Sequence, residues 1–507
     1  MKKRALSTLA LVAGLCFTAQ AASSSWSVDA DGNWVDTANW TGGVVPGLVG
    51  LTSANTDVAY LTNAITLNRT VTVDLNRNIG GVAFGSTSTN AFTLSGNTLV
   101  FGSGGTIIQT LESTGQHNDT IAANIQLRGT GNRNYTIRND SAGNTAGLVV
   151  NGDIGNAVSA SGTYTIYLDG VSTAVGIGAG TRNNTIAGVI KGASNGGKIA
   201  VVKNGTGLWT LTGNNTFNGG FTLNAGTLRY FGAGSQIFGT GAVTINDGVT
   251  FQKGNDSVPV INNAMTVNGN FRFFGNSTGN EWSGSMNLAA GTRIITNDAD
   301  LTISGVISNG GLTKAGTSTL TLSGVNTYTG ATTVAAGKLL VEGSLASEVT
   351  VQNGGTLGGT GTLQKVTLNA GAILAAGNSP GTMTFDGDVL MATGSTNIME
   401  ITDIAHDILM GNGANTLTMD GATVFDFTGF TGGVTNGYTI ALSDMFSNWS
   451  SVVTTGATYS AIGLTGGQSL NFTGSNLTVI PEPATVGMLG LGALLTIMLR
   501  RIRIRTR

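Results

Sequence analysis

The chain has 507 residues, with 24 Lys and Arg against 26 Asp and Glu, and only 10% of its residues are charged. This slightly acidic balance becomes more acidic in the expected mature chain, whose charge argues against nucleic acid and anionic membrane surfaces as partners. Its 79 glycines would suit a disordered chain, but Leu, Val and Ile recur at short regular spacing throughout, which argues for a packed core. Only five prolines occur, as expected for long sheets that must keep their backbone donors.

The segment 1–21 has the three parts of a secretory signal peptide. A positive stretch over 2–4 precedes an apolar stretch over 5–17, and Ala19 and Ala21 form a small-x-small cleavage site. Signal peptidase is therefore expected to release a mature chain that begins at Ala22.

The only cysteine, Cys16, lies inside this predicted signal peptide, and Leu15 before it argues against lipidation. The exported chain is then predicted to have no disulfide. Removal of both terminal segments leaves 16 Lys and Arg against 25 Asp and Glu, a net charge of about −9.

The interior consists of short apolar/polar alternations separated by Asn-Gly, Asp-Gly and Gly-Gly. Examples are Ile65 to Leu75 and Ser318 to Ser323, and no convincing helical period occurs between the two terminal segments. These patterns predict strands and turns, and hence an all-β protein.

One 27-residue unit occurs twice, at 203–229 and 314–340, with 13 of 27 positions identical. Each unit is predicted to begin with a strand, to turn at Gly-x-Asn-Thr-aromatic and to re-enter a strand. A finer glycine period runs at Gly226, Gly248, Gly269, Gly291, Gly337, Gly354 and Gly371.

The steps between these glycines, 17 to 23 residues once the 46-residue gap is halved, are typical of a solenoid. Glycine suits its corners, where the backbone needs positive φ. We therefore predict a right-handed parallel β-helix over 22–385. The competing architecture is an array of β-sandwiches, which would show alternating hairpins and no fixed step.

The 27-residue unit resembles the autotransporter-associated β-strand repeat (PATR type). The second copy fits well, with Ser318 in place of one glycine, while the first has Trp209 for a leucine and Phe217 for a tyrosine. Segments 25–46, 374–385 and, loosely, 406–411 also look like parts of such passengers. The resemblance implies a β-helical passenger.

The resemblance departs from the family after Gly371, where we expect little room for the large membrane β-barrel in which true autotransporters end. Self-translocation is therefore not expected. The segment 386–480 is left open between a C-terminal β-rich region and the end of the solenoid, because the coil period fades there.

The last segment, 481–507, combines three features: Pro481-Glu482-Pro483, an uncharged apolar run over 484–499, and a basic tail. The tail contains Arg500, Arg501, Arg503, Arg505 and Arg507. The run spans roughly 24 Å as a helix, somewhat short of a bilayer core. The arginines are expected to stay cytoplasmic.

This order resembles the PEP-CTERM sorting signal. The resemblance implies that an exosortase-type membrane protease cuts near Pro481 while 484–499 transiently spans the inner membrane. The chain would then reach the cell surface or an exopolysaccharide matrix. An ordinary tail anchor is the alternative.

Few residues point to chemistry, and no catalytic, metal or cofactor site is predicted. Asp403, His406 and Asp407 form D-x-x-H-D, which fits a weak metal or acid/base site less well than a polar stretch before a strand. The other histidine is His117, and no catalytic motif of β-helical enzymes is recognisable.

Asp29, Asp31, Asn33 and Asp36 imitate a calcium loop, but the twelfth position is Trp40 rather than glutamate, so a turn is expected. The glycines at 239–241 and 358–361 imitate phosphate loops and are predicted to be coil corners, because no Lys-Ser/Thr follows.

Three tryptophans, Trp26, Trp34 and Trp40, are expected to cap the first coil, the alternative being a platform for sugars. The sequence thus predicts a surface or matrix protein that is structural or adhesive and contacts exopolysaccharide or a cell surface. A carbohydrate-active enzyme or a specific glycan-binding module on the same scaffold is the alternative.

Overall fold

The computed structural model describes residues 22–481 except 51–54, 111–116, 142–145, 157–161, 174–183, 194–195, 233–235, 255–259, 276–278, 378–379, 432, 455, 466 and 474. The expected signal peptide, Glu482, Pro483, the segment 484–499 and the terminal arginines lie outside this part. In the part that is described, no helix has the length and apolarity to cross a bilayer.

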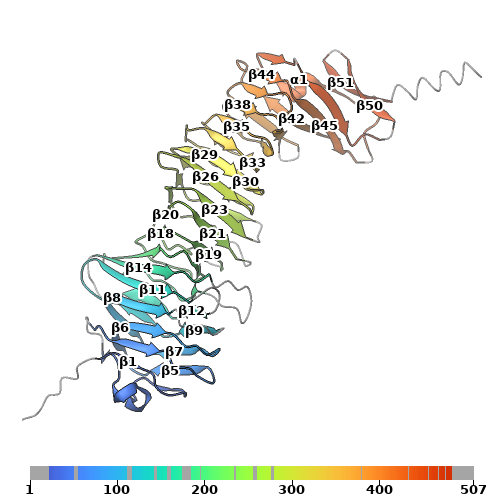
Figure 1. Ribbon diagram of the computed structural model, residues 1–507. Coiled ribbons are helices and arrows are strands. Elements are labelled where there is room, and N and C mark those ends of the chain that lie inside the picture. Colours follow the sequence, from blue (N-terminus) through green and yellow to red (C-terminus); the bar gives the residue numbers. More distant parts are fainter. Residues whose placement is uncertain are drawn as a thin grey trace, which may run out of the picture.

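The described chain winds into a long β-helical rod whose N-terminal and C-terminal coils lie at opposite ends (Figure 1). Successive coils pair in parallel along stacked sheets, so each strand bonds to the equivalent strand of the next coil. The predicted parallel β-helix is therefore confirmed, and the β-sandwich alternative is excluded by this pairing.

Sheet 1 runs along the first face as β1 (Ser24–Ser25), β4 (Val58–Leu61), β6 (Arg77–Phe84), β8 (Leu99–Gln109), β11 (Arg133–Asn139), β14 (Thr163–Gly170), β16 (Lys198–Lys203), β18 (Phe221–Leu223), β20 (Val243–Ile245), β22 (Met265–Val267), β25 (Met286–Asn287) and β28 (Ile307–Ser308). Three short strands join its N-terminal part: β3 (Leu48–Val49), β10 (Ile125–Leu127) and β13 (Ile154–Asn156).

Sheet 2 runs nearly the whole length of the rod as β2 (Gly32–Asn33), β5 (Arg69–Val73), β7 (Phe92–Gly96), β9 (His117–Ile121), β12 (Ala146–Val150), β15 (Thr185–Ile186), β17 (Leu208–Leu211), β19 (Thr227–Tyr230), β21 (Val249–Lys253), β23 (Phe271–Gly275), β26 (Thr292–Asn297), β29 (Gly311–Ala315), β32 (Thr332–Val334), β35 (Val349–Val351), β38 (Val366–Leu368), β41 (Val389–Met391), β44 (Thr416–Met419) and β48 (Ser451–Val453).

Sheet 3 begins midway as β24 (Asn280–Trp282), β27 (Leu301–Ile303), β30 (Thr319–Leu322), β33 (Gly337–Val341), β36 (Gly355–Gly359), β39 (Ile373–Ala376), β42 (Thr396–Thr402), β45 (Ala422–Gly429) and β49 (Thr458–Ile462). Sheet 4 follows sheet 1 as β31 (Val325–Asn326), β34 (Ser344–Leu345), β37 (Thr362–Leu363), β40 (Thr382–Phe385), β43 (Ile408–Met410) and β47 (Phe446–Ser447).

The rod ends in sheet 5, an antiparallel sheet of β46 (Thr439–Ala441), β51 (Asn476–Pro481) and β50 (Gln468–Thr473). The helices of the described part are short: η1 (Thr37–Asn39), η2 (Thr41–Gly43) and α1 (Leu442–Met445). Parallel pairing continues past Phe385 through β41, β44 and β48, so the segment left open by the sequence contributes further coils before sheet 5.

The coil length follows from the register. Val349 pairs with Val366, a step of 17 residues, and Val243 pairs with Met265, a step of 22. Some coils are longer: Arg133 pairs with Tyr164, a step of 31 residues, and Thr416 pairs with Ser451, a step of 35. The predicted step of 17 to 23 residues therefore describes many coils, such as the one from Arg69 to Phe92, but not the longer ones.

The core lies inside the coils because strands alternate one buried residue with one half-buried residue, as in β35 and β38. Residues at the same position stack from coil to coil, for example Val334, Val351, Leu368 and Met391, all at most 2% exposed. Each such side chain contributes about 1.5–3 kcal/mol on burial, so the coils stabilise one another.

The prediction that the periodic glycines adopt positive φ at coil corners is only partly right. Gly226, Gly248, Gly337, Gly354 and Gly371 have positive φ, between 66° and 81°. Gly269 and Gly291 do not, so their positions need no left-handed backbone. An added Cβ at Gly269 would lie 2.3 Å from Cα of Asp247, so close approach of the preceding coil excludes larger residues there.

The lysine that opens each 27-residue unit points into a coil corner. Lys314 Nζ donates to the carbonyls of Ala315, Gly316 and Ala336, at 2.9, 2.8 and 3.0 Å. In the first copy, Lys203 Nζ donates to Gly205 and Ala225 in the same way. Both side chains are fully buried, and burial lowers the pKa of each lysine to about 8.

The asparagine of the Gly-x-Asn-Thr-aromatic turn links three coils. Asn326 Oδ1 accepts a hydrogen bond from Ile307 N of the preceding coil, and Nδ2 donates to Ser344 O of the next. Asn215 bonds Ile190 N and Ile237 O in the same manner. The turn thus recurs because its side chain satisfies backbone groups of both neighbouring coils.

Candidate interaction surface

Two rows of uncharged polar side chains run along the outside of sheet 1. The first row consists of Thr222, Thr244 and Thr266, which are paired directly across β18, β20 and β22. The second consists of asparagines two residues further along each strand: Asn204, Asn224, Asn246 and Asn268. Because residues i and i+2 face the same side of a strand, both rows face outward.

The asparagine row is an ordered ladder. Asn224 Nδ2 donates to Asn204 Oδ1 at 2.7 Å, Asn246 to Asn224 at 2.5 Å, and Asn268 to Asn246 at 3.0 Å. Asn224, Asn246 and Asn268 therefore each use one N–H of the side-chain amide in the ladder, and the second N–H has no partner in the described part of the chain. The three threonine hydroxyls have no hydrogen-bond partner in the described part of the chain. We call these two rows the Thr/Asn array.

A second row of threonines runs along sheet 2 in the C-terminal half. Thr313, Thr333, Thr350 and Thr367 are paired in register across β29, β32, β35 and β38. Charged residues lie beside this row, and Lys365 Nζ is 3.7 Å from Glu348 Oε2. The two rows of threonines therefore differ in their electrostatic surroundings.

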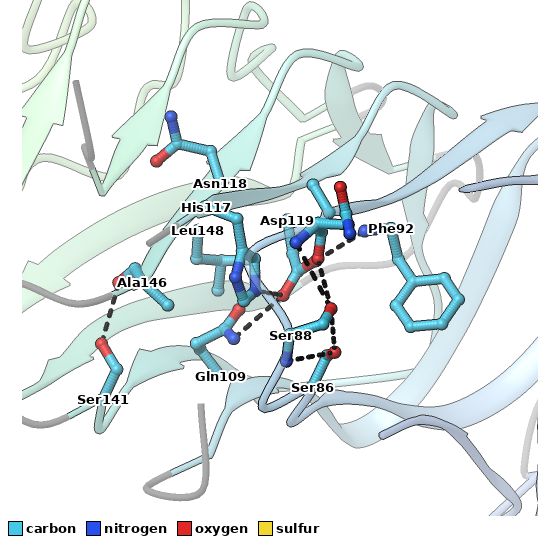
Figure 2. Close-up of polar contacts among 12 residues, drawn as sticks. Ser86, Ser88, Phe92, Gln109, His117, Asn118, Asp119, Ser141, Ala146 and Leu148 are labelled. Carbon is cyan, nitrogen blue, oxygen red and sulfur yellow. Dashed lines mark hydrogen bonds and ion pairs between the residues drawn. The ribbon is translucent and has the colours of Figure 1, made fainter. Parts of the chain in front are cut away.

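The interior holds a polar network around His117 at the start of β9 (Figure 2). His117 Nε2 lies 3.1 Å from Asp119 Oδ2, which also accepts from Gln109 Nε2 at 2.9 Å. Asp119 Oδ1 accepts from Phe92 N of the preceding coil at 2.7 Å.

His117 and Asp119 are residue types that serve in acid/base catalysis, but in this structure a substrate cannot reach them. The His117 side chain is 2% exposed and that of Asp119 is 0% exposed. In the described part of the chain Nδ1 of His117 has no hydrogen-bond partner, and Ser86 and Ser88 bond each other (Figure 2). The network links coils rather than presenting a nucleophile to a substrate.

The structure separates the residues of the D-x-x-H-D segment. Asp407 is buried and accepts from Gly381 N and Glu400 N, and burial raises its pKa to about 6. Asp403 instead accepts from Thr431 N, and His406 forms an isolated bridge with Ile401. In the part of the chain described, no three His, Cys, Asp or Glu side chains are placed to hold a metal ion.

The acidic residues of the calcium-like segment also diverge. Asp29 accepts from Thr66 and from Arg69 Nε at 2.7 Å, and its hydrogen bond with Arg69 lowers the pKa of Asp29 to about 2. Asp31 accepts from Thr70 N. Asp36 caps η1 through Ala38 N. The expected turn is confirmed, since Asp29 and Asp31 bind different residues of the next coil and Asp36 caps a helix within its own segment.

The tryptophans pack together at the N-terminal end. Trp26, Trp34 and Trp40 are at most 2% exposed, and the ring centroids of Trp26 and Trp40 lie 5.2 Å apart. Trp34 Nε1 donates to Pro46 O and Trp40 Nε1 to Trp34 O. This burial confirms the cap and excludes an exposed sugar platform.

The prediction of coil corners at 358–361 is wrong for Gly358 and Gly359, which lie in strand β36, where space for a Cβ is lacking. Gly239 and Gly359 have positive φ, whereas Gly241 and Gly358 do not. An added Cβ at Gly241 would lie 2.5 Å from Gly220 N. No phosphate-binding helix follows either segment, because a strand comes next in both cases: β20 after Gly241 and β37 after Gly359.

The Thr/Asn array was not predicted residue by residue. The sequence does contain it, as Phe-Thr-Leu-Asn at 221–224, Val-Thr-Ile-Asn at 243–246 and Met-Thr-Val-Asn at 265–268. The 22-residue recurrence of this tetrapeptide would have identified both rows, but it matters only once the strands are known to pair in register.

Residues 201–229 and 312–341 match the family model described as "Passenger-associated-transport-repeat". Both 27-residue units are therefore passenger-associated transport repeats. These matches cover the lysine corners and the asparagine turns described above, which gives the repeat a structural explanation. The resemblance to a PEP-CTERM signal has no counterpart among these matches.

Two curated proteins are similar over parts of the chain. Adhesin BmaC autotransporter from Brucella suis biovar 1 is 28% identical over 350 residues, 65% of this chain and 9% of that protein. An extracellular serine protease from Serratia marcescens is 41% identical over 98 residues, 19% of this chain and 9% of the protease. The matched regions thus span about a tenth of these relatives.

Among solved structures, the Haemophilus influenzae Hap adhesin aligns over 84% of this chain and 64% of its own, with 10% identity and a TM-score of 0.25. A TM-score this low does not support a shared fold, so the fold assignment rests on the strand pairing itself.

Proposed function

We propose that this protein is an exported adhesive rod of the cell surface or extracellular matrix. The observation that carries the proposal is the long, uniformly paired β-helix with straight rows of outward threonine and asparagine side chains. Similarity to an adhesin over 65% of the chain supports the same role.

The proposed mechanism is passive and multivalent. Each outward threonine or asparagine offers one weak hydrogen-bonding contact, and parallel strands repeat that contact about every 4.8 Å. Many such contacts on one rigid rod raise the total affinity without any strong individual site. Exopolysaccharide or a cell surface is the partner that this hydrogen-bonding chemistry fits.

Export and sorting are part of the proposal. Signal peptidase would cut after Ala21, and an exosortase-type protease would cut near Pro481, Glu482 and Pro483. Before that second cut, the apolar run 484–499 and the terminal arginines would hold the chain in the inner membrane. After it, the rod would lie at the surface or in the matrix.

The alternative function is enzymatic, favoured by the similarity to extracellular serine proteases. That similarity covers only 19% and 21% of this chain. The buried His117 and the divergent Asp403, His406 and Asp407 speak against turnover at either histidine. We therefore place the adhesive role first.

Intact mass of the chain recovered from the medium, the outer surface and the inner membrane tests the proposal. A mature chain that starts at Ala22 and ends near Pro481, found outside and retained by the producer's polysaccharide, is the expected result. A chain that still carries Arg500 to Arg507 and stays in the inner membrane would overturn the sorting step. An exported rod that adheres to no matrix or surface would overturn the adhesive role.

A further inference from the structure

A surface hollow of about 290 Å³ lies beside the Thr/Asn array. Its lining residues are all uncharged: Gln236, Gly239, Thr240, Gly241, Ala242, Asn262, Asn263 and Ala264. Asn263 is 5% exposed, and its Nδ2 donates to the carbonyls of Gly239 and Gly241 at 3.0 and 2.7 Å. The wall of the hollow is therefore held by a fixed, buried amide.

The hollow opens onto the array through a row of small residues. Ala242 and Ala264 line the hollow and also lie immediately before β20 and β22. Both are exposed, and each stands two residues before a threonine of the array, Thr244 or Thr266, just ahead of the strand. Hollow, small row, threonine row and asparagine row thus follow one another across sheet 1.

The spacing of these rows follows from strand geometry. Neighbouring coils lie about 4.8 Å apart, and residues i and i+2 of one strand lie about 6.6 Å apart. The surface therefore offers hydroxyl and amide groups as a regular grid, with the free hydroxyls and N–H groups pointing outward. Such a grid fits a polymer whose own hydroxyl groups repeat at regular intervals along its length.

The chemistry of the groups restricts the ligand. No residue of the two rows or of the hollow is charged, so the surface offers nothing to pair with a charged polymer. It also lacks an exposed aromatic ring, so hydroxyl contacts rather than ring stacking must carry recognition.

We propose that the hollow and the Thr/Asn array form a binding site for a neutral polysaccharide chain lying along the rod axis. The chain places one sugar in the hollow and hydrogen-bonds its hydroxyls to the threonine and asparagine rows. This inference rests on the proposed adhesive function and assigns its ligand to one face of the rod.

Affinity electrophoresis of the exported full-length protein through gels that contain hydroxyethyl cellulose tests the site, with alginate as the anionic comparison. The double substitution Ala242→Leu and Ala264→Leu fills the hollow at exposed positions and is expected to weaken binding at least about tenfold. The triple substitution of Thr222, Thr244 and Thr266 by Val removes only hydroxyls and is expected to weaken binding at least about threefold.

Matched control variants come from the second row of threonines. The first control is Ala331→Leu, because Ala331 stands two residues before Thr333 as Ala264 stands two residues before Thr266. The second control replaces Thr333, Thr350 and Thr367 by Val and so matches the triple variant of the array. Both controls are expected to bind within about twofold of the unmodified protein. Thermal unfolding followed by circular dichroism verifies that all variants fold.

Unchanged binding after the hollow is filled, equal losses in test and control variants, or a preference for alginate would each overturn the site. Adhesion to the producer's matrix is measured on the same variants. A rod that adheres to the matrix but does not bind hydroxyethyl cellulose refutes the site and leaves the adhesive function standing. A rod that binds hydroxyethyl cellulose through this face but adheres to no matrix refutes the adhesive function alone.

Discussion

At the scale of single residues, the coil corners depend on buried lysines. Lys314 brings an ammonium group into the core, and its three carbonyl partners offset part of the cost of removing that charge from water. The lowered pKa of this lysine indicates that the compensation is incomplete. The lysine is thus a structural group rather than a ligand for substrate.

Replacement of Lys314 by Met keeps the apolar stem but leaves three corner carbonyls without their donor. We expect a loss of about 2–3 kcal/mol in the free energy of unfolding, from the magnitude of hydrogen bonds to charged groups. Urea unfolding followed by tryptophan fluorescence measures it. Lys365→Met, at an exposed lysine paired loosely with Glu348, is expected to cost less than about 0.5 kcal/mol. Equal effects would contradict the corner role.

The same lysines predict a pH dependence. Their folded-state pKa of about 8 lies below the ordinary value of 10.5, so between these values the unfolded chain binds more protons than the folded chain. Stability should therefore rise as the pH increases from 8 towards 10.5. Chemical unfolding across this range measures the slope, and Lys314→Met should reduce it. A slope unaffected by the substitution would refute the assignment.

At the scale of elements, the corner glycines differ in what they require. Gly337 has φ of +66°, and an added Cβ would lie 2.5 Å from Gly316 O and 2.8 Å from Lys314 Nζ. Gly354 has φ of +81° and open space where its Cβ would be. Gly337 is thus required both by its positive φ and by the lack of space for a Cβ, whereas Gly354 is required by its positive φ alone.

These two corners allow backbone strain to be separated from crowding. Gly354→Ala is expected to cost about 1–2 kcal/mol, the ordinary penalty for a left-handed alanine. Gly337→Ala should cost clearly more, because Gly316 O belongs to the preceding coil and cannot move away without breaking the stack. Urea midpoints of the two variants give the comparison. Equal costs would mean that crowding at Gly337 is relieved by a small shift.

At the scale of the whole molecule, charge is distributed unevenly along the rod. Residues 22–365 carry 16 Lys and Arg against 17 Asp and Glu, whereas 366–481 carry eight acidic residues and no Lys or Arg. These are Asp386, Asp388, Glu400, Asp403, Asp407, Asp420, Asp426 and Asp444. The last coils therefore repel themselves, while the middle of the rod does not.

Screening should stabilise the C-terminal coils selectively. We expect amide hydrogen exchange after Phe385 to slow when NaCl is raised from about 20 to about 500 mM, because the Debye length falls from roughly 20 Å, which spans several coils, to roughly 4 Å, which spans about one. Exchange in 243–345 should change little under the same conditions, which makes it the internal control. A uniform response along the rod would contradict the prediction.

Local patterns predicted much of this fold. Alternating apolar and polar residues predicted the strands, and the glycine period predicted the coil step. The repeated Lys and Asn positions identified the 27-residue unit, and the structure explains them through hydrogen bonds at the corner and at the turn. The tryptophan cap also followed from clustering near one end, because an open coil must be covered. These features depend on residues that lie close together in the sequence, so they can be predicted without the tertiary structure.

The tertiary structure decided the rest, because register between coils is set by packing across gaps of unequal length. Only the pairing of Thr222 with Thr244 and Thr266 aligns three outward hydroxyls, and only the packing of two successive coils places 236–242 beside 262–264 to form the hollow. His117 and Asp407 are polar residues that the fold buries. The sequence by itself determined an all-β solenoid with its repeats, whereas the stacking of its coils decided which polar groups face water and which satisfy the core.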